Sequence, residues 1–466
     1  MNIIGIVLAA GQGKRMKSKL YKVLHPVCGK PMVGHVVSTL ENLNTSRTVV
    51  IVGHGAEAVK SYLGERAEYA LQAEQLGTGH AVLQAKPLLG DEEGLAIVIC
   101  GDTPLVSNET LEGMIRLHQE RGASATILTA NVAEPKGYGR IIRDEQGYVT
   151  KIVEDKDCSP EQRRVQEINT GTYCFDNRKL FTALAQVKND NSQNEYYITD
   201  VISILNGQGE RVEGYVLDDA VESIGVNDRL ALSEAEQAMR ARINRGHMLN
   251  GVTIIDPSAT YIEADVRIGA DTVVHPGSVL RGSTVIGEDC VIGPQADIAD
   301  SSLASGVTVK HSVLQDAVVG AGSSVGPFAY LRPGADLGQN VKVGDFVEIK
   351  NAKLGDDTKV SHLSYIGDAV IGRNVNVGCG AITVNYDGFN KQVTEVEDDA
   401  FVGSNVNLIA PVKVGKGAYV VAGSTITNNV EPGDLAIARE RQVNKAGYAD
   451  KLRAKFAAKK ASSKKQ

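Results

Sequence analysis

Two kinds of hydrophobic patterning divide this chain. Up to about residue 230, continuous apolar runs alternate with amphipathic stretches. The segments TVVIVG (48–53) and LAIVIC (95–100) are rich in β-branched residues and are bounded by turn-forming residues, which predicts buried parallel strands. Residues 110–119 place four side chains on one helical face: Leu111, Met114, Ile115 and His118. This alternation predicts a layered α/β domain of the Rossmann-like kind.

Beyond Gly251 the apolar residues recur at every sixth position. The anchors are Ile262, Ile268, Val274, Leu280, Ile286, Ile292 and Ile298, then Val319, Val325, Leu331, Leu337, Val343 and Ile349, then Val402, Leu408, Val414 and Val420. A small or β-branched residue follows four positions later, as at Thr272, Ser278 and Thr284, although Lys353 breaks this rule. Such a period predicts a parallel β-helix whose short strands form three faces. A β-sandwich with short strands would not keep this register.

Residues 231–250, between the two regions, are rich in good helix formers, which predicts a connecting helix. The predicted organisation is therefore an α/β domain over residues 1–229, a linker helix over 230–250, and a β-helix over 251–466 with a basic tail. The length of 466 residues agrees with two or three domains.

Composition narrows the class of protein. A net charge of −7 argues against a nucleic-acid binder. No stretch is long and apolar enough to span a membrane, and residues 3–10 are too short for a secretory signal, so a cytoplasmic location is expected. The scattered cysteines predict free thiols instead of a zinc site: Cys28, Cys100, Cys158, Cys174, Cys290 and Cys379.

In the stretch LAAGQGKRM (8–16), an apolar run ends in two glycines that are followed by basic residues. Glycines at a strand end let backbone N–H groups surround phosphates, and Arg15 and Lys22 would supply positive charge. The alternative is a tight turn with solvated basic residues. Asp102 follows a buried strand at the edge where such sheets bind ligands, and its carboxylate suits Mg²⁺, although it could instead cap a turn.

The hexapeptide register breaks at VSHLSYIGDA (360–369) and at the insertion VNYDGFNK (384–391). Insertions in a solenoid project as loops and often form binding faces. His362 lies in the first break, where an imidazole could take the proton that an ammonium group loses during acyl transfer. The alternative is a polar surface histidine.

These motifs carry a resemblance to a known family over essentially the whole chain. LAAGQGKRM with Lys22 resembles the signature of sugar-phosphate nucleotidyltransferases, and the six-residue period is that of hexapeptide-repeat acyltransferases. Both halves in this order resemble the family of bacterial bifunctional N-acetylglucosamine-1-phosphate uridylyltransferases/glucosamine-1-phosphate N-acetyltransferases. Further segments that match are LQAEQLGTGHA, GYGRI, INTG, GVNDR, HLSYIGDA and NYDG. The resemblance implies a left-handed β-helix, a homotrimer, and a role in making precursors for cell-wall and other amino-sugar polymers.

For the first half, the resemblance implies Mg²⁺ bound by Asp102 and Asn227, and UTP as co-substrate. It also implies that Arg15 is the catalytic cation. The nucleotide and its sugar would contact Leu8, Ala9, Ala10, Gly11, Lys22, Gln72, Gly77, Thr78, Gly101, Gly139, Glu154, Asn169 and Asn227. Uracil recognition is assigned to Gln72, Gly77 and Thr78, which suits an amide. Lys14, Tyr21 and Cys100 depart from the residues that are common in the family.

For the second half, the resemblance implies acetyl-CoA as co-substrate, His362 as the base and Glu348 as a carboxylate that orients or assists it. Arg332 and Lys350 would hold the sugar phosphate. The remaining contacts to glucosamine 1-phosphate and acetyl-CoA are Tyr365, Asn376, Cys379, Asn385, Tyr386, Ser404, Ala422 and Arg439. Cys379 stands where many relatives have Ala.

Three functions remain open on these grounds. The leading hypothesis is an enzyme with both activities that acts on small-molecule substrates. The runner-up is a nucleotidyltransferase with one activity and a structural or regulatory β-helix, and His362 with the NYDG insertion separates the two because a scaffold needs neither. The third is a β-helical assembly protein with a decayed α/β half, against which Arg15, Lys22, Asp102 and Asn227 argue.

Overall fold

A computed structural model describes residues 2–463 of the chain. The chain divides into two compact units. One comprises Met1–Arg267 with Val279–Ser283, and the other comprises Ile268–Ser278 with Thr284–Gln466. The linker helix predicted over 230–250 is present as α8 (Arg229–Leu249). The domain boundaries predicted at residues 229 and 250 stay a prediction.

The first unit is built on a twisted central sheet. Its strand order is β11-β7-β10-β6-β1-β4-β5, and β8 and β9 pair beside β10. The strands are β1 (Ile3–Ala9), β4 (Arg47–Val52), β5 (Glu68–Leu71), β6 (Leu95–Cys100), β7 (Ala125–Asn131), β8 (Arg140–Arg143), β9 (Val149–Val153), β10 (Glu167–Asp176) and β11 (Val212–Val216). The predicted strands at 48–53 and 95–100 are confirmed, and both pair parallel to β1. β10 runs antiparallel to its neighbours β6 and β7, so the sheet is mixed.

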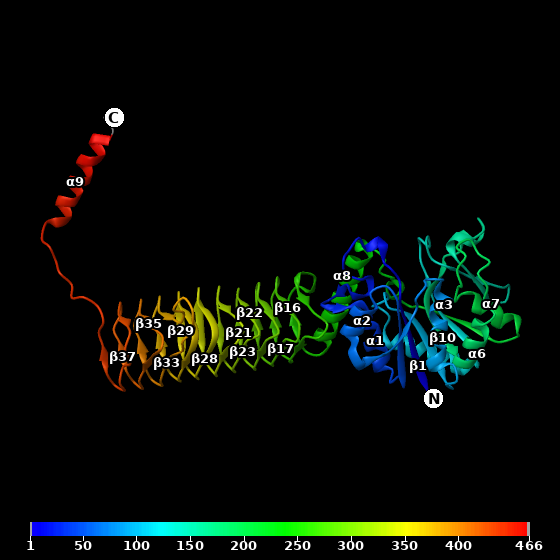
Figure 1. The fold of residues 1–466 in the computed structure, drawn as a ribbon, viewed down its shortest axis with the longest axis horizontal. Helices are drawn as coiled ribbons and strands as arrows, with labels where there is room; N and C mark the ends of the chain where they lie inside the picture. Colours follow the sequence, from blue (N-terminus) through cyan, green and yellow to red (C-terminus); the bar gives the residue numbers. More distant parts are fainter. Residues whose placement is uncertain (1, 464–466) are drawn as a thin grey trace. The chain divides into compact units, whose positions relative to one another are not determined.

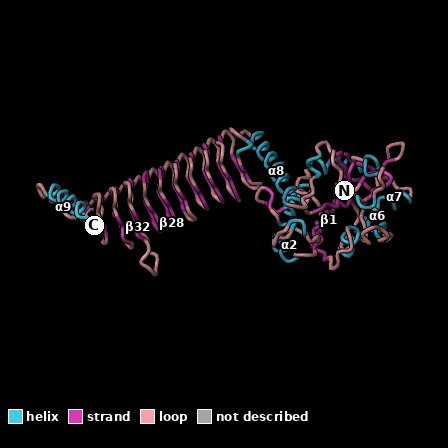
Figure 2. Tube along the Cα trace, turned by 90° about the horizontal axis from the view of Figure 1, so that it is seen from above, coloured by secondary structure: helices cyan, strands magenta, loops and turns pink. Residues whose placement is uncertain are grey.

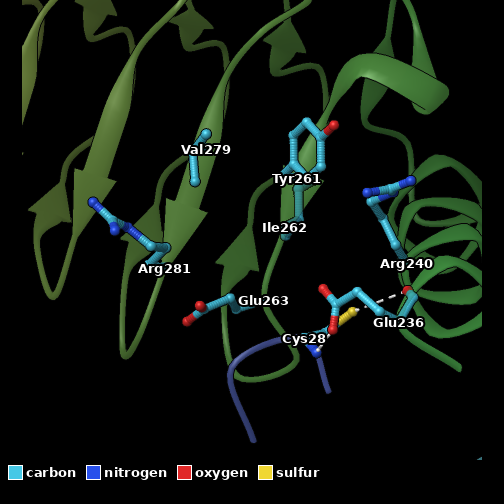
Figure 3. A pocket seen from close by; sticks show the side chains of 8 residues that line it. All are labelled: Cys28, Glu236, Arg240, Tyr261, Ile262, Glu263, Val279 and Arg281. Carbon is cyan, nitrogen blue, oxygen red and sulfur yellow. Dashed lines mark hydrogen bonds between the residues drawn. The ribbon is translucent and has the colours of Figure 1, made fainter. Parts of the chain in front are cut away.

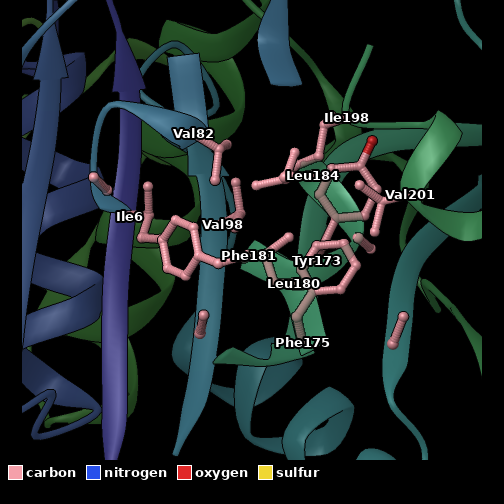
Figure 4. Packing of buried hydrophobic residues seen from close by; sticks show 14 of the residues in the cluster. Ile6, Val82, Val98, Tyr173, Phe175, Leu180, Phe181, Leu184, Ile198 and Val201 are labelled. Atoms are coloured by element: carbon pink, nitrogen blue, oxygen red, sulfur yellow. The ribbon is translucent and has the colours of Figure 1, made fainter. Parts of the chain in front are cut away.

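Helices cover both faces of this sheet. They are α1 (Met32–Asn42), α2 (Ala56–Leu63), α3 (Thr78–Leu83), α4 (Lys86–Leu89), α5 (Asn108–Arg121), α6 (Asn177–Leu184) and α7 (Asp200–Gly207). The helical face predicted from residues 110–119 is confirmed, because the same four side chains of α5 are buried. Figure 4 shows α6 packing Leu180, Phe181 and Leu184 against β10, where the rings of Tyr173 and Phe175 stack 5.5 Å apart. This apolar layer makes the sheet a rigid base for side chains at its edge.

The same unit also holds a small hairpin, α8 and the first coil of short strands. The hairpin is β2 (Pro26–Val27) with β3 (Lys30–Pro31), and the first coil includes β12 (Thr253–Ile254), β13 (Tyr261–Ile262) and β16 (Val279–Arg281). The Cys28 N–H donates to Glu236 Oε2 at 2.6 Å, and its carbonyl accepts from the Ala264 N–H at 2.9 Å. Together these parts line a cavity of about 270 Å³, in which Arg240 lies over the Tyr261 ring (Figure 3). The hairpin and the first coil, which are far apart in the sequence, thus both contact α8.

The second unit is a stack of short parallel strands (Figure 1). One face holds β15 (Val273–Val274), β18 (Val291–Ile292), β21 (Thr308–Val309), β24 (Ser324–Val325), β27 (Lys342–Asp345), β29 (Lys359–His362), β31 (Asn376–Val377), β34 (Phe401–Val402), β37 (Tyr419–Val420) and β39 (Leu435–Ala436). The other faces hold β17 (Val285–Ile286), β19 (Asp297–Ala299), β20 (Ser302–Leu303), β22 (Val313–Gln315), β23 (Val318–Val319), β25 (Tyr330–Leu331), β26 (Ala335–Leu337), β28 (Glu348–Leu354), β30 (Tyr365–Ile371), β32 (Ile382–Val384), β33 (Thr394–Val396), β35 (Asn407–Ile409), β36 (Val412–Val414) and β38 (Thr425–Ile426). β14 (Arg267–Ile268) lies where the two units meet in the sequence.

The predicted hexapeptide anchors point inward. All of them are buried except Ile268, which is half-buried. The register stacks anchor on anchor, as where Val325 pairs with Val343 and Leu331 with Ile349. Lys353 breaks the rule because β28 continues through its corner, so that Ala352 is buried in its place and Lys353 is exposed. The parallel β-helix is therefore confirmed in its repeats and its core, which agree with a left-handed β-helix.

Residues at the end of the chain form another helix, α9 (Tyr448–Ser463), with every side chain exposed. Most of the predicted basic tail therefore belongs to this helix. The last part of that tail, residues 464–466, lies outside the described residues. Within residues 2–463, no helix combines the length and the apolar character that a membrane crossing requires.

Candidate active sites

The loop after β1 brings a cation close to bare backbone. Gly13 has φ of 62°, in the left-handed region, and a Cβ there would lie 2.5 Å from the Cβ of Lys22. Lys22 starts a short 3₁₀ turn (Lys22–Leu24), so the loop 10–13 and this turn pack directly on each other. A glycine is required at this position both for the backbone conformation and for the approach of Lys22.

Lys22 joins the residues predicted to bind metal. Its ammonium group contacts the Asp102 carboxylate and donates to Asn227 Oδ1 at 3.2 Å. The side chains of Lys22 and Asp102 are only 16% and 13% exposed. Asp102 follows β6, whereas Asn227 immediately precedes the Asp228 that caps α8. The structure thus brings together a lysine, a carboxylate and an amide from three separate segments.

Most of the predicted nucleotide contacts line one cavity of about 250 Å³. Its predicted members are Leu8, Ala10, Gly11, Lys22, Gln72, Gly77, Thr78 and Asp102. Gln72 is buried, and its amide donates to the Gly77 carbonyl at 3.1 Å. Gly101 donates its N–H to the Leu8 carbonyl at 2.9 Å, and Ala9 is buried in β1 beneath the loop.

Four residues that the sequence reasoning did not assign also line this cavity: Gln75, Ala81, Cys100 and Glu195. Burial, followed by the Asp102 charge, raises the pKa of the Cys100 thiol to about 12. The segment LQAEQLGTGHA contained Gln75 and Ala81, but Glu195 lies in a distant loop that no motif marked. Arg15 is exposed and does not line the cavity.

The predicted sugar contacts form a second cluster. Asn169 donates its N–H to the Gly139 carbonyl at 2.9 Å, and Glu154 accepts from the Thr199 hydroxyl at 3.3 Å. The pairing of β10 shifts between Asn169 and Tyr173, and such an irregularity re-aims the side chains on the strand. Burial raises the pKa of the Glu154 carboxyl. Gly139, Glu154 and Asn169 are therefore neighbours, as predicted.

In the β-helix, predicted residues share one corner of successive coils. Each of four backbone N–H groups donates to the carbonyl one coil earlier: Leu363 to Asp345, Gly380 to His362, Asn405 to Cys379 and Gly423 to Ser404. This ladder stacks Asp345, His362, Cys379, Ser404 and Ala422 at the same corner. Neighbouring coils lie about 4.8 Å apart, so the predicted base and acetyl-CoA contacts form one ridge. Arg439 lies beside it, with its Cδ 3.6 Å from where a Cβ on Gly423 would be.

The predicted phosphate-binding residues occupy the adjoining face. Tyr330 pairs with Glu348 in register, and Glu348 with Tyr365. Arg332 follows β25, and its Nη1 donates to Glu348 Oε1 at 2.7 Å. Lys350 lies one coil above Arg332 in the same column, because Leu331 pairs with Ile349. Two cations and a phenol therefore face the same side of the helix.

A buried carboxylate organises the loop that was predicted from the insertion. Asp368 is 7% exposed; its carboxylate accepts from Asn351 Nδ2 at 2.6 Å and contacts the amide of Asn385. Burial opposes its ionisation, but the two amide hydrogen bonds together with the charges of Lys350 and Lys391 outweigh burial and keep the pKa of this carboxyl below its usual value. Figure 2 shows a loop leaving the stack beside β32. Asn385 directly follows this strand, which ends at Val384.

The insertion loop adds a cation that the sequence reasoning missed. Lys391 forms a bridge with Tyr386, and the nearby Lys350 lowers the pKa of its ammonium group. Two mutually repelling lysines gain from an anion between them. Arg332, Lys350 and Lys391 thus form a cation cluster that suits a phosphate group.

Asn376 lies on β31, one coil beyond Lys359 in the register.

Comparison with known proteins identifies both halves. The nucleotidyl transferase family model matches residues 4–237, the bacterial transferase hexapeptide model (six repeats) matches residues 265–300, and the model for the hexapeptide repeat of succinyl-transferase matches residues 393–428. A "Bifunctional protein GlmU" from Brevibacillus brevis is 62% identical over 450 residues, which cover 97% of this chain and 98% of that protein. The chain belongs to the bifunctional GlmU family.

Other GlmU relatives agree. Those of a Geobacillus species and of Enterococcus faecalis are each 58% identical, over 447 and 451 residues, covering 96% and 97% of this chain and 97% and 98% of those proteins. A solved structure of a UDP-glucose pyrophosphorylase complexed with UDP-glucose has a TM-score of 0.43 and 20% identity, and covers 52% of this chain and 100% of its own. As a GlmU, the chain is an enzyme with uridylyltransferase and acetyltransferase activities.

Proposed function

We propose that the chain makes UDP-N-acetylglucosamine in two steps. The β-helix transfers acetyl from acetyl-CoA to glucosamine 1-phosphate, and the α/β domain then transfers uridylyl from UTP to N-acetylglucosamine 1-phosphate and releases pyrophosphate. The observation that carries the first step is the corner ridge, where His362 lies directly beside Asp345 and Cys379. A β-helix that served only as a scaffold would need neither this ridge nor the cation cluster beside it.

In the first step, His362 is the base. Arg332 and Lys350 hold the sugar phosphate, because two cations stacked in adjacent coils match its charge. Tyr365, Asn376, Asn385 and Tyr386 contact the sugar. Ser404, Ala422, Cys379 and Arg439 contact acetyl-CoA along the same corner and beside it.

In the second step, positioning and electrostatics carry most of the barrier to phosphoryl chemistry, and no protein nucleophile is required. The loop through Gly11 and Gly13 lies against phosphates, while Lys22 and Arg15 balance their charge. Gln72, Gly77 and Thr78 contact uracil inside the cavity that they line. Gly139, Glu154 and Asn169 hold the N-acetylglucosamine.

Asp102 and Asn227 fit a magnesium ion. Both contact the Lys22 ammonium group, so a carboxylate oxygen and an amide oxygen lie close together. Mg²⁺ prefers oxygen ligands and usually takes one or two from the protein and others from water and substrate phosphates. When bound, Mg²⁺ would neutralise phosphate charge.

The proposed assembly is a homotrimer in the cytoplasm. Phe328, Phe346 and Leu363 form an exposed apolar ridge next to His362, and the two phenyl rings stack 5.6 Å apart. Exposed patches of this kind mark interaction surfaces, and a neighbouring chain would cover this one. The free cysteines agree with a reducing compartment.

The decisive experiment follows free CoA and pyrophosphate separately in the presence of glucosamine 1-phosphate, acetyl-CoA, UTP and Mg²⁺. We expect release of both, with pyrophosphate depending on acetyl-CoA. His362→Ala should abolish CoA release and spare pyrophosphate release from supplied N-acetylglucosamine 1-phosphate, and Asp102→Ala should do the reverse. Pyrophosphate without CoA in the wild type would make the β-helix a scaffold, and an unchanged magnesium dependence in Asp102→Ala would remove the metal assignment.

A further inference from the structure

One carboxylate in the corner ridge contacts the proposed base directly. Asp345 Oδ1 lies 2.6 Å from His362 Nδ1, and the two residues pair in register between β27 and β29. The backbone hydrogen bond from Leu363 to the Asp345 carbonyl, 3.0 Å long, fixes the spacing of the two coils. The contact therefore follows from the geometry of the helix and does not depend on a flexible loop.

This contact decides which imidazole nitrogen can act as a base. An ionised carboxylate only accepts hydrogen bonds, so a neutral His362 must carry its proton on Nδ1. The lone pair then lies on Nε2. The hydrogen bond to His362 also keeps the pKa of the Asp345 carboxyl below its usual value, which keeps it an acceptor near neutral pH.

The imidazole needs such a partner because it is not held by packing. The side chain of His362 is 59% exposed and that of Asp345 is 38% exposed. An exposed ring can rotate among several rotamers, and a second hydrogen-bonding partner restricts its direction.

Glu348, which the resemblance names as the carboxylate that orients or assists the base, is engaged elsewhere. It accepts from the Arg332 guanidinium at 2.7 Å, and both side chains are 38% exposed. The hydrogen bond raises the pKa of Arg332. In this arrangement, Glu348 orients a phosphate-binding cation, while the carboxylate in contact with His362 is Asp345.

We propose that Asp345 is the positioning residue for the base of acetyl transfer, holding His362 in the tautomer and orientation that present Nε2 to the substrate ammonium group. This inference rests on the proposed acetyl transfer. The ammonium group loses two protons as it becomes an amide: the first passes to Nε2 and on to water, and the second goes to the CoA thiolate that leaves as the C–S bond breaks. Asp345 exchanges no proton.

The test compares Asp345→Ala and Asp345→Asn in the full chain by CoA release. We expect Asp345→Ala to lower kcat by about 10- to 100-fold, the range found when metal-binding histidines lose a hydrogen-bonding partner, with both KM values within twofold. Asp345→Asn should fall between this variant and the wild type, since its amide oxygen still accepts from Nδ1–H. Uridylyl transfer should be unchanged. The matched control is Asp336→Ala, which removes a carboxylate of β26 whose partner is Lys353, 3.3 Å away.

Two results would overturn the inference: a kcat of Asp345→Ala within twofold of the wild type, or a rise in both KM values at constant kcat. A crystal structure of Asp345→Ala provides a measurement that does not need activity. We expect His362 to leave its present rotamer or to occupy several, and a single unchanged rotamer would also count against the inference. If the wild type released no CoA, acetyl transfer itself would fail, while the rotamer would still decide whether Asp345 orients the ring.

Discussion

At the residue scale, the nucleotide site depends on glycines at two positions, Gly13 and Gly77, where a Cβ atom would not fit. A Cβ on Gly77, whose φ is 110°, would lie 2.5 Å from the Tyr196 carbonyl. Tyr21, a departure from the family pattern, also rests against a glycine, since a Cβ on Gly55 would lie 2.4 Å from its ring. Tyr21 thus packs in place and leaves the adjacent Lys22 against Asp102.

Gly13→Ala should therefore impair uridylyl transfer. The added methyl group would meet the Lys22 side chain and would place an alanine in the left-handed region, which costs about 1–2 kcal/mol. We expect kcat/KM for pyrophosphate release to fall about tenfold or more, which is about 1.4 kcal/mol of transition-state stabilisation, while CoA release stays normal. The control is Gly122→Ala, which has a similar φ of 58° with nothing within 4 Å of its Cβ. Equal losses in both variants would refute a specific role for Gly13.

Glu154→Gln should stabilise the folded protein at neutral pH while it weakens sugar binding. Burial raises the pKa of Glu154, and the charges of Asp157 and Asp200 add to this. The folded state therefore disfavours ionised Glu154, so the wild type loses stability as the pH rises from the unfolded pKa through the higher folded one. Glutamine avoids this loss. We expect an equal Tm for both proteins near pH 4.5 and a higher Tm for the variant at pH 7.5.

The same substitution should raise the KM for N-acetylglucosamine 1-phosphate by about tenfold, because a charged hydrogen bond to the sugar is worth roughly 1.5–3 kcal/mol. The exposed Glu145→Gln serves as the control for a general charge effect. A Tm difference that is independent of pH would contradict the explanation from burial.

At the element scale, the sequence predicted the β-helix well and its corners poorly. The six-residue period marks the anchors because burial selects apolar side chains, and Leu331, Val343 and Ile349 are buried as predicted. Asp345 was not predicted. It lies 17 positions before His362, a spacing that is not a multiple of six, so only the strand register brings the two together. Lys391 was missed for a similar reason, since the insertion loop folds back to Lys350.

Because Cys379 belongs to the corner ridge, its alkylation should stop acetyl transfer. Cys379 lies one coil from both His362 and Ser404 and is partly exposed, whereas Cys28, Cys158, Cys174 and Cys290 are buried. Cys100 also lines a site, but burial raises its pKa to about 12, so its thiol stays protonated at pH 8. We expect N-ethylmaleimide to remove CoA release before pyrophosphate release. Cys379→Ala should remain active and resist the reagent, and an equally sensitive Cys379→Ala would show that another group is modified.

At the scale of the whole molecule, the two patterns in the sequence correspond to different folds, and each carries its own site. The alternation of strands and helices predicted the sheet and the edge where Asp102 lies, but not the antiparallel course of β10. Local patterning cannot reveal that course, because strand direction depends on a long connection. The antiparallel pairing of β10 with β8 nevertheless places Asn169 beside Gly139.

Independent sites predict complementation between two inactive proteins. Asp102→Ala should still make N-acetylglucosamine 1-phosphate, and His362→Ala should still consume it, because the two side chains belong to different compact units. A mixture supplied with glucosamine 1-phosphate, acetyl-CoA and UTP should therefore form UDP-N-acetylglucosamine after a lag, during which the intermediate accumulates in solution. Chromatography of the nucleotide sugar measures this. The double variant, which should form none, is the control. If the mixture also formed none while each variant kept its remaining activity, the intermediate would have to pass between sites within one assembly without entering solution.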